Sequence, residues 1–155
     1  MTWHPHVTVA AVIENDGRFL MVEEEVSAGL VYNQPAGHLE HGESLIEAVI
    51  RETLEETAWR MRPTALIGLH QWTSSPDGDT FLRLCFSGTL YAHEPQRRLD
   101  TGIHRVLWLS RDDLVAQPAR HRSPMVMRAV DDYLAGRRLP LDFVTCISDS
   151  VTTNS

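Results

Sequence analysis

Hydrophobic and polar residues alternate along the first part of the chain with the two-residue period of half-buried β-strands. Residues 7–11 follow this alternation, and an apolar run resumes at residues 18–22. Between them, Asn15-Asp16-Gly17 suits a tight turn, because these residue types tolerate a positive φ. The pattern predicts a β-hairpin, followed by a strand at 30–34 that leads into a glycine-bearing loop at 35–37.

The pattern changes to a helical period over residues 44–58 and then returns to strands. Three further strands, a short helix and a last helix are expected at 65–72, 81–91, 104–109, 110–114 and 124–135. Ser110 is a suitable N-cap for the short helix, and Gly136 ends the last one. Strands interleaved with helices predict one layered α/β domain on a mixed sheet. We expect this domain to span residues 1–147, with the small, polar residues 148–155 as a flexible tail.

Composition and charge narrow the class of protein. A chain of 155 residues with 43% hydrophobic and 23% charged residues has the size and make-up of one globular domain. No apolar run approaches the roughly 20 residues that a membrane helix needs, and the first residues lack the basic lead of a signal peptide. The net charge of −7 argues against general nucleic-acid binding, which needs a basic surface. Cys85 and Cys146 form no CxxC pair, so we expect free thiols and a cytoplasmic protein.

The most unusual segment is residues 35–59, which hold six glutamates and one arginine. On a helix at about 100° per residue, Glu52, Glu55 and Glu56 fall on one side, where neighbouring carboxylates repel each other. Two explanations are open. The triplet is either a solvated acidic face or a site for a hard divalent cation such as Mg²⁺, whose ligands are carboxylates, water and substrate phosphates. A carboxylate that is not a ligand would be available to take a proton from an attacking water.

The other charges of this segment have simpler explanations. Arg51 follows Glu47 by four residues, a favourable spacing for an ion pair. Glu43 precedes the helix, where it offsets the positive end of the helix dipole. The triplet itself has little positive charge nearby to offset its repulsion, apart from Arg60, which is within reach of Glu56.

The spacing of the segment resembles the Nudix box of the Nudix hydrolases. Gly37, five residues, Glu43, seven residues and then Arg51-Glu52-Thr53-Leu54-Glu55-Glu56 reproduce eight spacing-locked positions. The chain departs from the box at Thr53 and Trp59, where aliphatic residues are usual, and at Ala58, where glycine is usual. None of these departures removes a carboxylate. Ala58 would strain the helix end if a positive φ is required there.

The resemblance implies an α/β/α sandwich with a mixed β-sheet, and Mg²⁺-dependent hydrolysis of a phosphoanhydride bond with Mn²⁺ as a possible substitute. It implies metal ligation by Glu55 and Glu56 as the principal ligands, by Glu52, and by a carbonyl oxygen of Ala36 or Gly37. Glu52 would alternatively act as the catalytic base. Arg51 would orient the glutamates together with Glu43.

A looser similarity extends beyond the box, for example through residues 5–24 and 80–86. It is to family members that release the terminal phosphate of nucleoside di- and triphosphates, of thiamine pyrophosphate and of its hydroxymethylpyrimidine pyrophosphate precursor. The alternatives are a pyrophosphatase acting on ADP-ribose, a dinucleoside polyphosphate or an oxidised nucleotide, and a non-catalytic nucleotide-sensing module. The expected partner is a small phosphorylated molecule rather than nucleic acid or a membrane, and the expected state is a monomer or homodimer.

Several residues outside the box are candidates for binding this molecule. Gln34 and His38 border the expected site. Arg83 is either a phosphate ligand or a surface charge. Trp72 and Phe81 belong either to the core or to a surface on which a substrate ring stacks. The candidates for an additional carboxylate are Asp77 and Asp79.

Overall fold

A computed structural model of the chain describes residues 2–149. The strands of this part are β1 (His6–Val12), β2 (Glu14–Asn15), β3 (Arg18–Val26), β4 (Gly29–Asn33), β5 (Ala36–His38), β6 (Trp59–Thr73), β7 (Thr80–His93) and β8 (Ile103–Ser110). The α-helices are α1 (Leu45–Thr57), α2 (Arg111–Val115) and α3 (Met125–Leu134). Two 3₁₀ helices complete it, η1 (Pro118–Arg120) and η2 (Leu141–Phe143).

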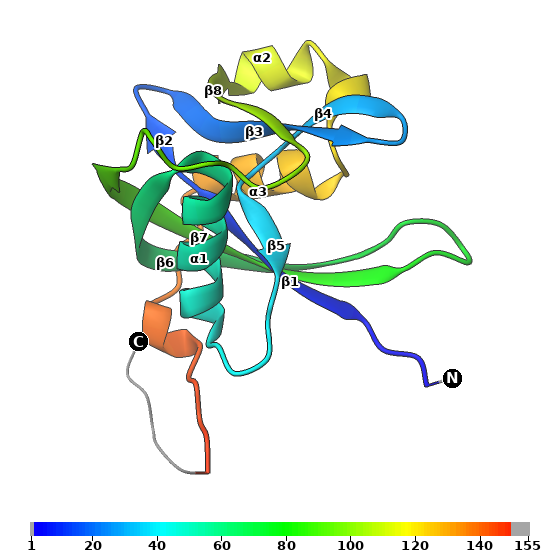
Figure 1. The fold of residues 1–155 in the computed structure, drawn as a ribbon. Helices are drawn as coiled ribbons and strands as arrows, with labels where there is room; N and C mark the ends of the chain where they lie inside the picture. The colour runs from blue at the N-terminus through cyan, green and yellow to red at the C-terminus, as the bar shows by residue number, and fades with distance from the viewer. Residues whose placement is uncertain (1, 150–155) are drawn as a thin grey trace.

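The strands form two sheets (Figure 1). The first has the order β5–β1–β7–β6, in which β1 and β7 are parallel and the other pairs are antiparallel. The second has the order β2–β3–β4, and β8 also pairs with β3, all in antiparallel register. The predicted mixed sheet is therefore confirmed, and an antiparallel sheet accompanies it.

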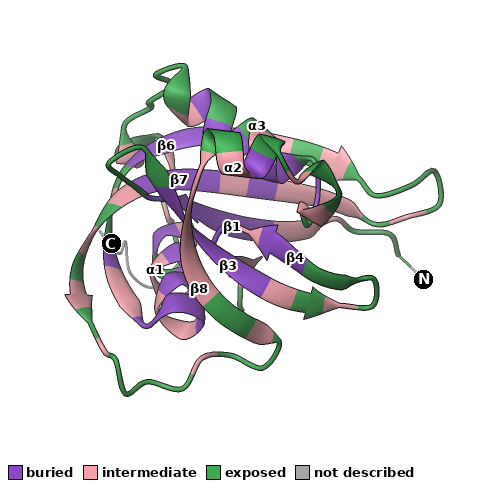
Figure 2. Cartoon of the chain, turned by 90° about the horizontal axis from the view of Figure 1, so that it is seen from above, coloured by how far each residue is buried: buried purple, intermediate pink, exposed green. Residues whose placement is uncertain are grey.

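Alternating side chains on β1 divide the core into two parts. Val9 and Ala11 pack in one cluster with the apolar face of α1, whereas Ala10 and Val12 pack in another with α3. Figure 2 shows the buried residues concentrated along β1, β3, β7 and the inner sides of the helices. The first sheet therefore lies between α1 and α3, which is the predicted α/β/α arrangement.

Helix α1, which carries most of the box, has a defined cap at each end. Ser44 accepts a hydrogen bond from the Glu47 N–H, and the Glu47 carboxylate accepts one from the Ser44 N–H. Because Glu47 completes this capping box, the ion pair predicted between Glu47 and Arg51 is wrong. At the other end Ala58 has a φ of 63° and donates its N–H to the Leu54 carbonyl. The helix end does require a positive φ, which strains an L-residue by about 1–2 kcal/mol.

The two other departures from the box are accommodated by packing. Thr53 is fully buried, and its hydroxyl donates to the Val49 carbonyl at 2.8 Å. The hydroxyl is thereby satisfied in the core, where an unmade hydrogen bond would be costly. Trp59 opens β6, and its ring stacks on His93 of β7 with 4.3 Å between centroids.

The elements follow one another as predicted, but the predicted hairpin of residues 7–11 with 18–22 is wrong. β1 pairs with β5 and β7, and across the turn only the two-residue β2 pairs with β3. β6 and β7 are longer than predicted, and residues 36–38, predicted as part of a loop, form β5. β5 pairs with β1 at the edge of the first sheet, so the glycine-bearing segment is held against α1. Residues 150–155 of the predicted tail lie outside the described residues. Within residues 2–149, no helix is long and apolar enough to cross a membrane.

Candidate active site

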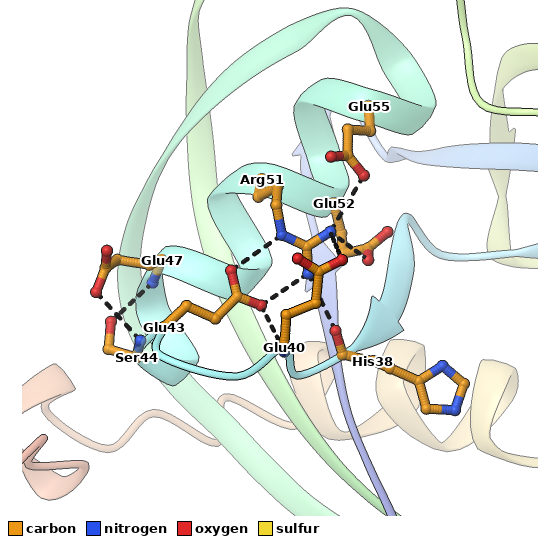
Figure 3. A network of polar contacts seen from close by, with 8 residues as sticks. All are labelled: His38, Glu40, Glu43, Ser44, Glu47, Arg51, Glu52 and Glu55. Carbon is orange, nitrogen blue, oxygen red and sulfur yellow. Dashed lines mark hydrogen bonds and ion pairs between the residues drawn. The ribbon is translucent and has the colours of Figure 1, made fainter.

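One arginine organises the acidic segment (Figure 3). The Arg51 guanidinium donates to both oxygens of Glu43, at 2.7 and 2.9 Å, in a bidentate pair. It also donates to Glu52 at 2.8 Å, to Glu55 at 3.1 Å and to the His38 carbonyl at 3.0 Å. The predicted pairing of Arg51 with Glu43 is thus present in the structure. Both oxygens of Glu43 are engaged by Arg51, and this contact lowers the pKa of the Glu43 carboxyl.

Three carboxylates converge beside this arginine. Glu52, Glu55 and Asp100 each offer one oxygen, and the three oxygens lie within 4.8 Å of one another. Asp100 is brought here from the segment before β8 by its N–H, which donates to the Glu55 carbonyl at 3.0 Å. The pattern gave no signal for Asp100, since it lies more than forty residues beyond the box. Asp79, one of the two predicted extra carboxylates, is 3.6 Å from His6 instead.

Glu56 occupies a different position from the other two helix carboxylates. Its Oε1 accepts a hydrogen bond from the Ala36 N–H at 2.9 Å, so it faces the edge strand β5. Arg60 pairs with Glu94 at 3.3 Å, so the predicted contact of Arg60 with Glu56 is wrong. Burial raises the pKa of Glu56 to about 9, although the hydrogen bond from Ala36 opposes this.

Gly37 allows β5 to approach Glu52 closely. A Cβ at this position would lie 2.1 Å from Cδ of Glu52 and 2.2 and 2.4 Å from its two oxygens. Glu52 is only 8% exposed. Burial raises its pKa to about 7, against the opposing effect of Arg51. Two buried carboxylates with raised pKa values, Glu52 and Glu56, therefore lie one helical turn apart in the site.

Comparison with known proteins agrees with this geometry. The family model of the NUDIX domain matches residues 3–130. The chain is 41% identical over 140 residues to Phosphatase NudJ of Escherichia coli (strain K12), a match that covers 90% of each chain. The chain belongs to the Nudix family.

Solved structures show the same fold. A NUDIX hydrolase from Nitrosomonas europaea superposes with a TM-score of 0.91 and 49% identity, covering 95% of this chain and all of that one. A MutT NUDIX hydrolase from Burkholderia pseudomallei, at 19% identity, superposes with a TM-score of 0.71 over 84% of this chain and 98% of its own. The protein is a Nudix hydrolase that acts on phosphoanhydride bonds of small phosphorylated compounds.

The Nudix site fits a divalent cation by its donor set. Glu52, Glu55 and Asp100 supply hard oxygen ligands, which suit such a cation. A bound cation would also provide the positive charge that keeps Glu52 and Glu56 ionised near neutral pH, against the effect of burial. Glu56 is not in the group of three, and Ala36 contributes its N–H to the contacts of Glu56. Ligation by Glu56 and by a carbonyl of Ala36 or Gly37 stays a prediction.

Next to these carboxylates is a cavity of about 420 Å³. Its lining includes Glu24 of β3, Asn33 of β4, Ser123 just before α3 and Met125 of α3. It also includes four residues predicted from the sequence: His38, Trp72, Phe81 and Arg83. Arg83 is buried, with 3% of its surface exposed, so the alternative of a surface charge is excluded. His38 lies at the rim, and its ring contacts that of His6.

Gln34 is the exception among the predicted substrate contacts. It is buried and does not line this cavity. Its Nε2 donates to the Val126 carbonyl at 2.9 Å, so the side chain ties the segment before β5 to helix α3. The prediction that Gln34 contacts the substrate is corrected to a structural role.

Proposed function

We propose that the protein is a Mg²⁺-dependent phosphatase, with Mn²⁺ as a substitute, that removes the terminal phosphate from nucleoside di- and triphosphates. Thiamine pyrophosphate and its hydroxymethylpyrimidine pyrophosphate precursor belong to the same proposed substrate range. The observation that carries the proposal is the convergence of Glu52, Glu55 and Asp100, of which Glu52 lines a cavity. The similarity to Phosphatase NudJ supports orthophosphate as the released product. The free thiols of Cys85 and Cys146 support a cytoplasmic location.

In this proposal Glu52, Glu55 and Asp100 are the metal ligands, and Glu52 is also the general base. Glu52, Glu55 and Asp100 would hold Mg²⁺, which when bound neutralises phosphate charge and lowers the pKa of a water. Glu52 takes the proton of the attacking water on Oε2, since Oε1 is held by Arg51 and no residue within 2–149 is hydrogen-bonded to Oε2. A bound cation would keep the Glu52 carboxylate ionised near neutral pH, so Glu52 would be able to accept this proton.

Arg51 keeps the base in position. It is held by the bidentate pair with Glu43 and by the His38 carbonyl, so its contact with Glu52 has little freedom. Glu43 therefore acts on the reaction through Arg51, as a positioning residue.

The test is hydrolysis of a panel of phosphorylated compounds with Mg²⁺ or Mn²⁺, with the products identified. Wild-type protein is expected to release orthophosphate from di- and triphosphates. Glu52→Gln preserves shape and removes the base, so its turnover should fall by about 10²–10⁴-fold while its circular dichroism and melting temperature remain near wild type. Near-wild-type turnover of Glu52→Gln would contradict the assignment.

Two other outcomes identify the alternatives. Cleavage of ADP-ribose, dinucleoside polyphosphates or oxidised nucleotides, with no orthophosphate from di- and triphosphates, identifies a Nudix pyrophosphatase. Failure to hydrolyse any compound of the panel with either metal favours a nucleotide-sensing module.

A further inference from the structure

Two cross-strand rows of side chains lie on the face of the first sheet that α3 covers, and four of their members line the cavity: Thr8, Trp72, Phe81 and Arg83. In the outer row, Phe81 of β7 pairs in register with His6 of β1 and with Trp72 of β6. The three rings are stacked, with centroids 5.0 Å apart for His6–Phe81 and 5.7 Å for Trp72–Phe81. The next row inward, two residues along each strand, consists of Thr8, Arg83 and His70.

Arg83 differs from the other arginine of the cavity lining because its charge is not paired. Its Nη2 donates to Oδ1 of Asn33 at 2.8 Å, and no carboxylate among residues 2–149 forms an ion pair with it. Each Arg83 nitrogen that makes no hydrogen bond keeps some exposed surface. Because Arg83 lines the cavity, we infer that these N–H donors face it. Arg122, the other arginine of the lining, is paired with Glu24 at 3.5 Å.

A buried charge with a single neutral partner destabilises the folded protein. Burial lowers the pKa of Arg83, but a guanidinium stays charged in proteins, so it cannot escape this cost by losing a proton. A structural role is normally accompanied by carboxylate partners, as at Arg51. Arg83 therefore has the properties of a site for an anion that comes from outside the chain.

We propose that Arg83 binds the phosphoryl group that stays with the organic part of the substrate, while an aromatic ring of that part packs against Trp72 and Phe81. This assignment rests on the proposed function and narrows its substrates to di- and triphosphates that carry an aromatic ring. Arg83 and the two rings are then specificity-determining residues.

The order of the strands supports this arrangement. The carboxylates lie at β5, through the contact of Ala36 with Glu56 and the approach of Gly37 to Glu52. Arg83 is two strands away on β7, and Trp72 is on the next strand, β6. Neighbouring strands are about 4.8 Å apart, so β5 and β7 are separated by about 10 Å, a distance that the long Arg83 side chain and a diphosphate bridge together. The reacting phosphate, the retained phosphate and the ring follow one another across the sheet in that order.

The first test measures binding without turnover. A nucleoside monophosphate and thiamine monophosphate, the products that retain a phosphate, are titrated by calorimetry into metal-free wild-type, Arg83→Met, Trp72→Leu and Arg62→Met proteins. Arg62 is an exposed arginine of β6 that lies over Tyr91 and away from the cavity, so Arg62→Met is the matched control. We expect Arg83→Met to weaken binding about 10–100-fold, Trp72→Leu about tenfold, and Arg62→Met to match wild type. Equal binding by Arg83→Met and wild type, or no binding of either monophosphate by wild type, overturns the proposal.

A second measurement separates this role from a structural one. If Arg83 is present for a ligand, Arg83→Met removes an uncompensated buried charge, and the melting temperature of the ligand-free protein stays the same or rises. A clear fall of the melting temperature in Arg83→Met, with monophosphate binding retained by Arg83→Lys and Arg83→Met alike, means that Arg83 supports the fold and overturns the proposal.

Steady-state kinetics then test which substrates are selected. Contacts to the retained phosphate exist before and during the reaction, so Arg83→Lys should raise KM more than it lowers kcat. Trp72→Leu should reduce, by about tenfold, the preference in kcat/KM for a nucleoside triphosphate over inorganic tripolyphosphate, which has no ring. An unchanged preference overturns the ring contact. Because the binding test needs neither metal nor turnover, failure of the proposed hydrolysis and failure of this assignment are distinguishable.

Discussion

Replacing Gly37 with alanine tests whether the close approach of β5 to α1 sets the position of the Glu52 carboxylate. The added Cβ would lie 2.1 Å from Cδ of Glu52, whereas real Cβ contacts below 3.0 Å essentially never occur. The carboxyl group must therefore move by about 1 Å, the difference between the two values (3.0 − 2.1 = 0.9 Å). Gly37 is not among the residues with a positive φ, so alanine is compatible with the backbone there.

The displacement affects both stability and catalysis. Moving Glu52 breaks its 2.8 Å contact with Arg51, and a hydrogen bond between charged groups contributes about 1.5–3 kcal/mol. We expect the melting temperature to fall by about 3–12 °C, since 1 kcal/mol corresponds to about 2–4 °C for a chain of this size. A 1 Å misplacement of a catalytic group can reduce turnover by about 10²-fold. Orthophosphate release and Mn²⁺ affinity by calorimetry are the assays.

A double-mutant cycle isolates the contact between these two residues. In a Glu52→Ala background the clash has no partner, so Gly37→Ala should change the free energy of unfolding and the residual activity by less than about 0.5 kcal/mol. Additive effects of the two substitutions would show that Gly37 acts through something other than Glu52, and the reasoning would be refuted.

Two further substitutions test residues that hold the site in place. Arg51→Lys keeps the charge but loses the planar guanidinium that holds both oxygens of Glu43. We expect kcat to fall by at least about tenfold, a loss of about 1.4 kcal/mol. An unchanged kcat would contradict the positioning role of Arg51. Asp132 accepts hydrogen bonds from His70 and Arg128, at 2.8 and 3.0 Å, and although burial opposes ionisation, these bonds lower the pKa of Asp132 below 3.8. This stabilisation is present above pH 3.8 and is lost as the pH falls through the lower pKa of the folded state. In urea unfolding at pH 7, Asp132→Asn should therefore lower the free energy of unfolding by about 1.5–3 kcal/mol, and by progressively less below pH 3.8. A difference that does not change with pH would refute this linkage.

The parts of the structure that the sequence predicts are those that depend on neighbours in the chain. The Asn15-Asp16-Gly17 turn and the limits of α1 follow from turn and cap residues, and Ser44 and Ala58 occupy the predicted ends. The prediction for Glu47 is wrong because two local patterns compete for this residue: a four-residue ion-pair spacing and a three-residue capping spacing. The capping spacing prevails, since Arg51 finds better partners in Glu43 and Glu52.

What the sequence does not predict depends on contacts between distant segments. Asp100 joins Glu55 through a backbone hydrogen bond that no local pattern encodes. The burial of Arg83 depends on the parallel pairing of β7 with β1 and on Asn33 from the second sheet. Alternation along β7 places Arg83 on the opposite face from its neighbours, but it does not say whether that face is covered.

The two walls of the cavity carry opposite charges, so we expect them to bind different parts of the substrate. On the α1 side, Arg51 is in contact with Glu40, Glu43, Glu52 and Glu55, and Asp100 and Glu56 add further negative charge. This wall repels a polyphosphate until a cation binds, so metal and reacting phosphate should strengthen each other's binding. On the β7 side, Arg83 is positive whether or not a cation is present. Its contribution to binding therefore persists in the metal-free protein, and a monophosphate bound there reports on Arg83 and the neighbouring rings rather than on the coupled metal site.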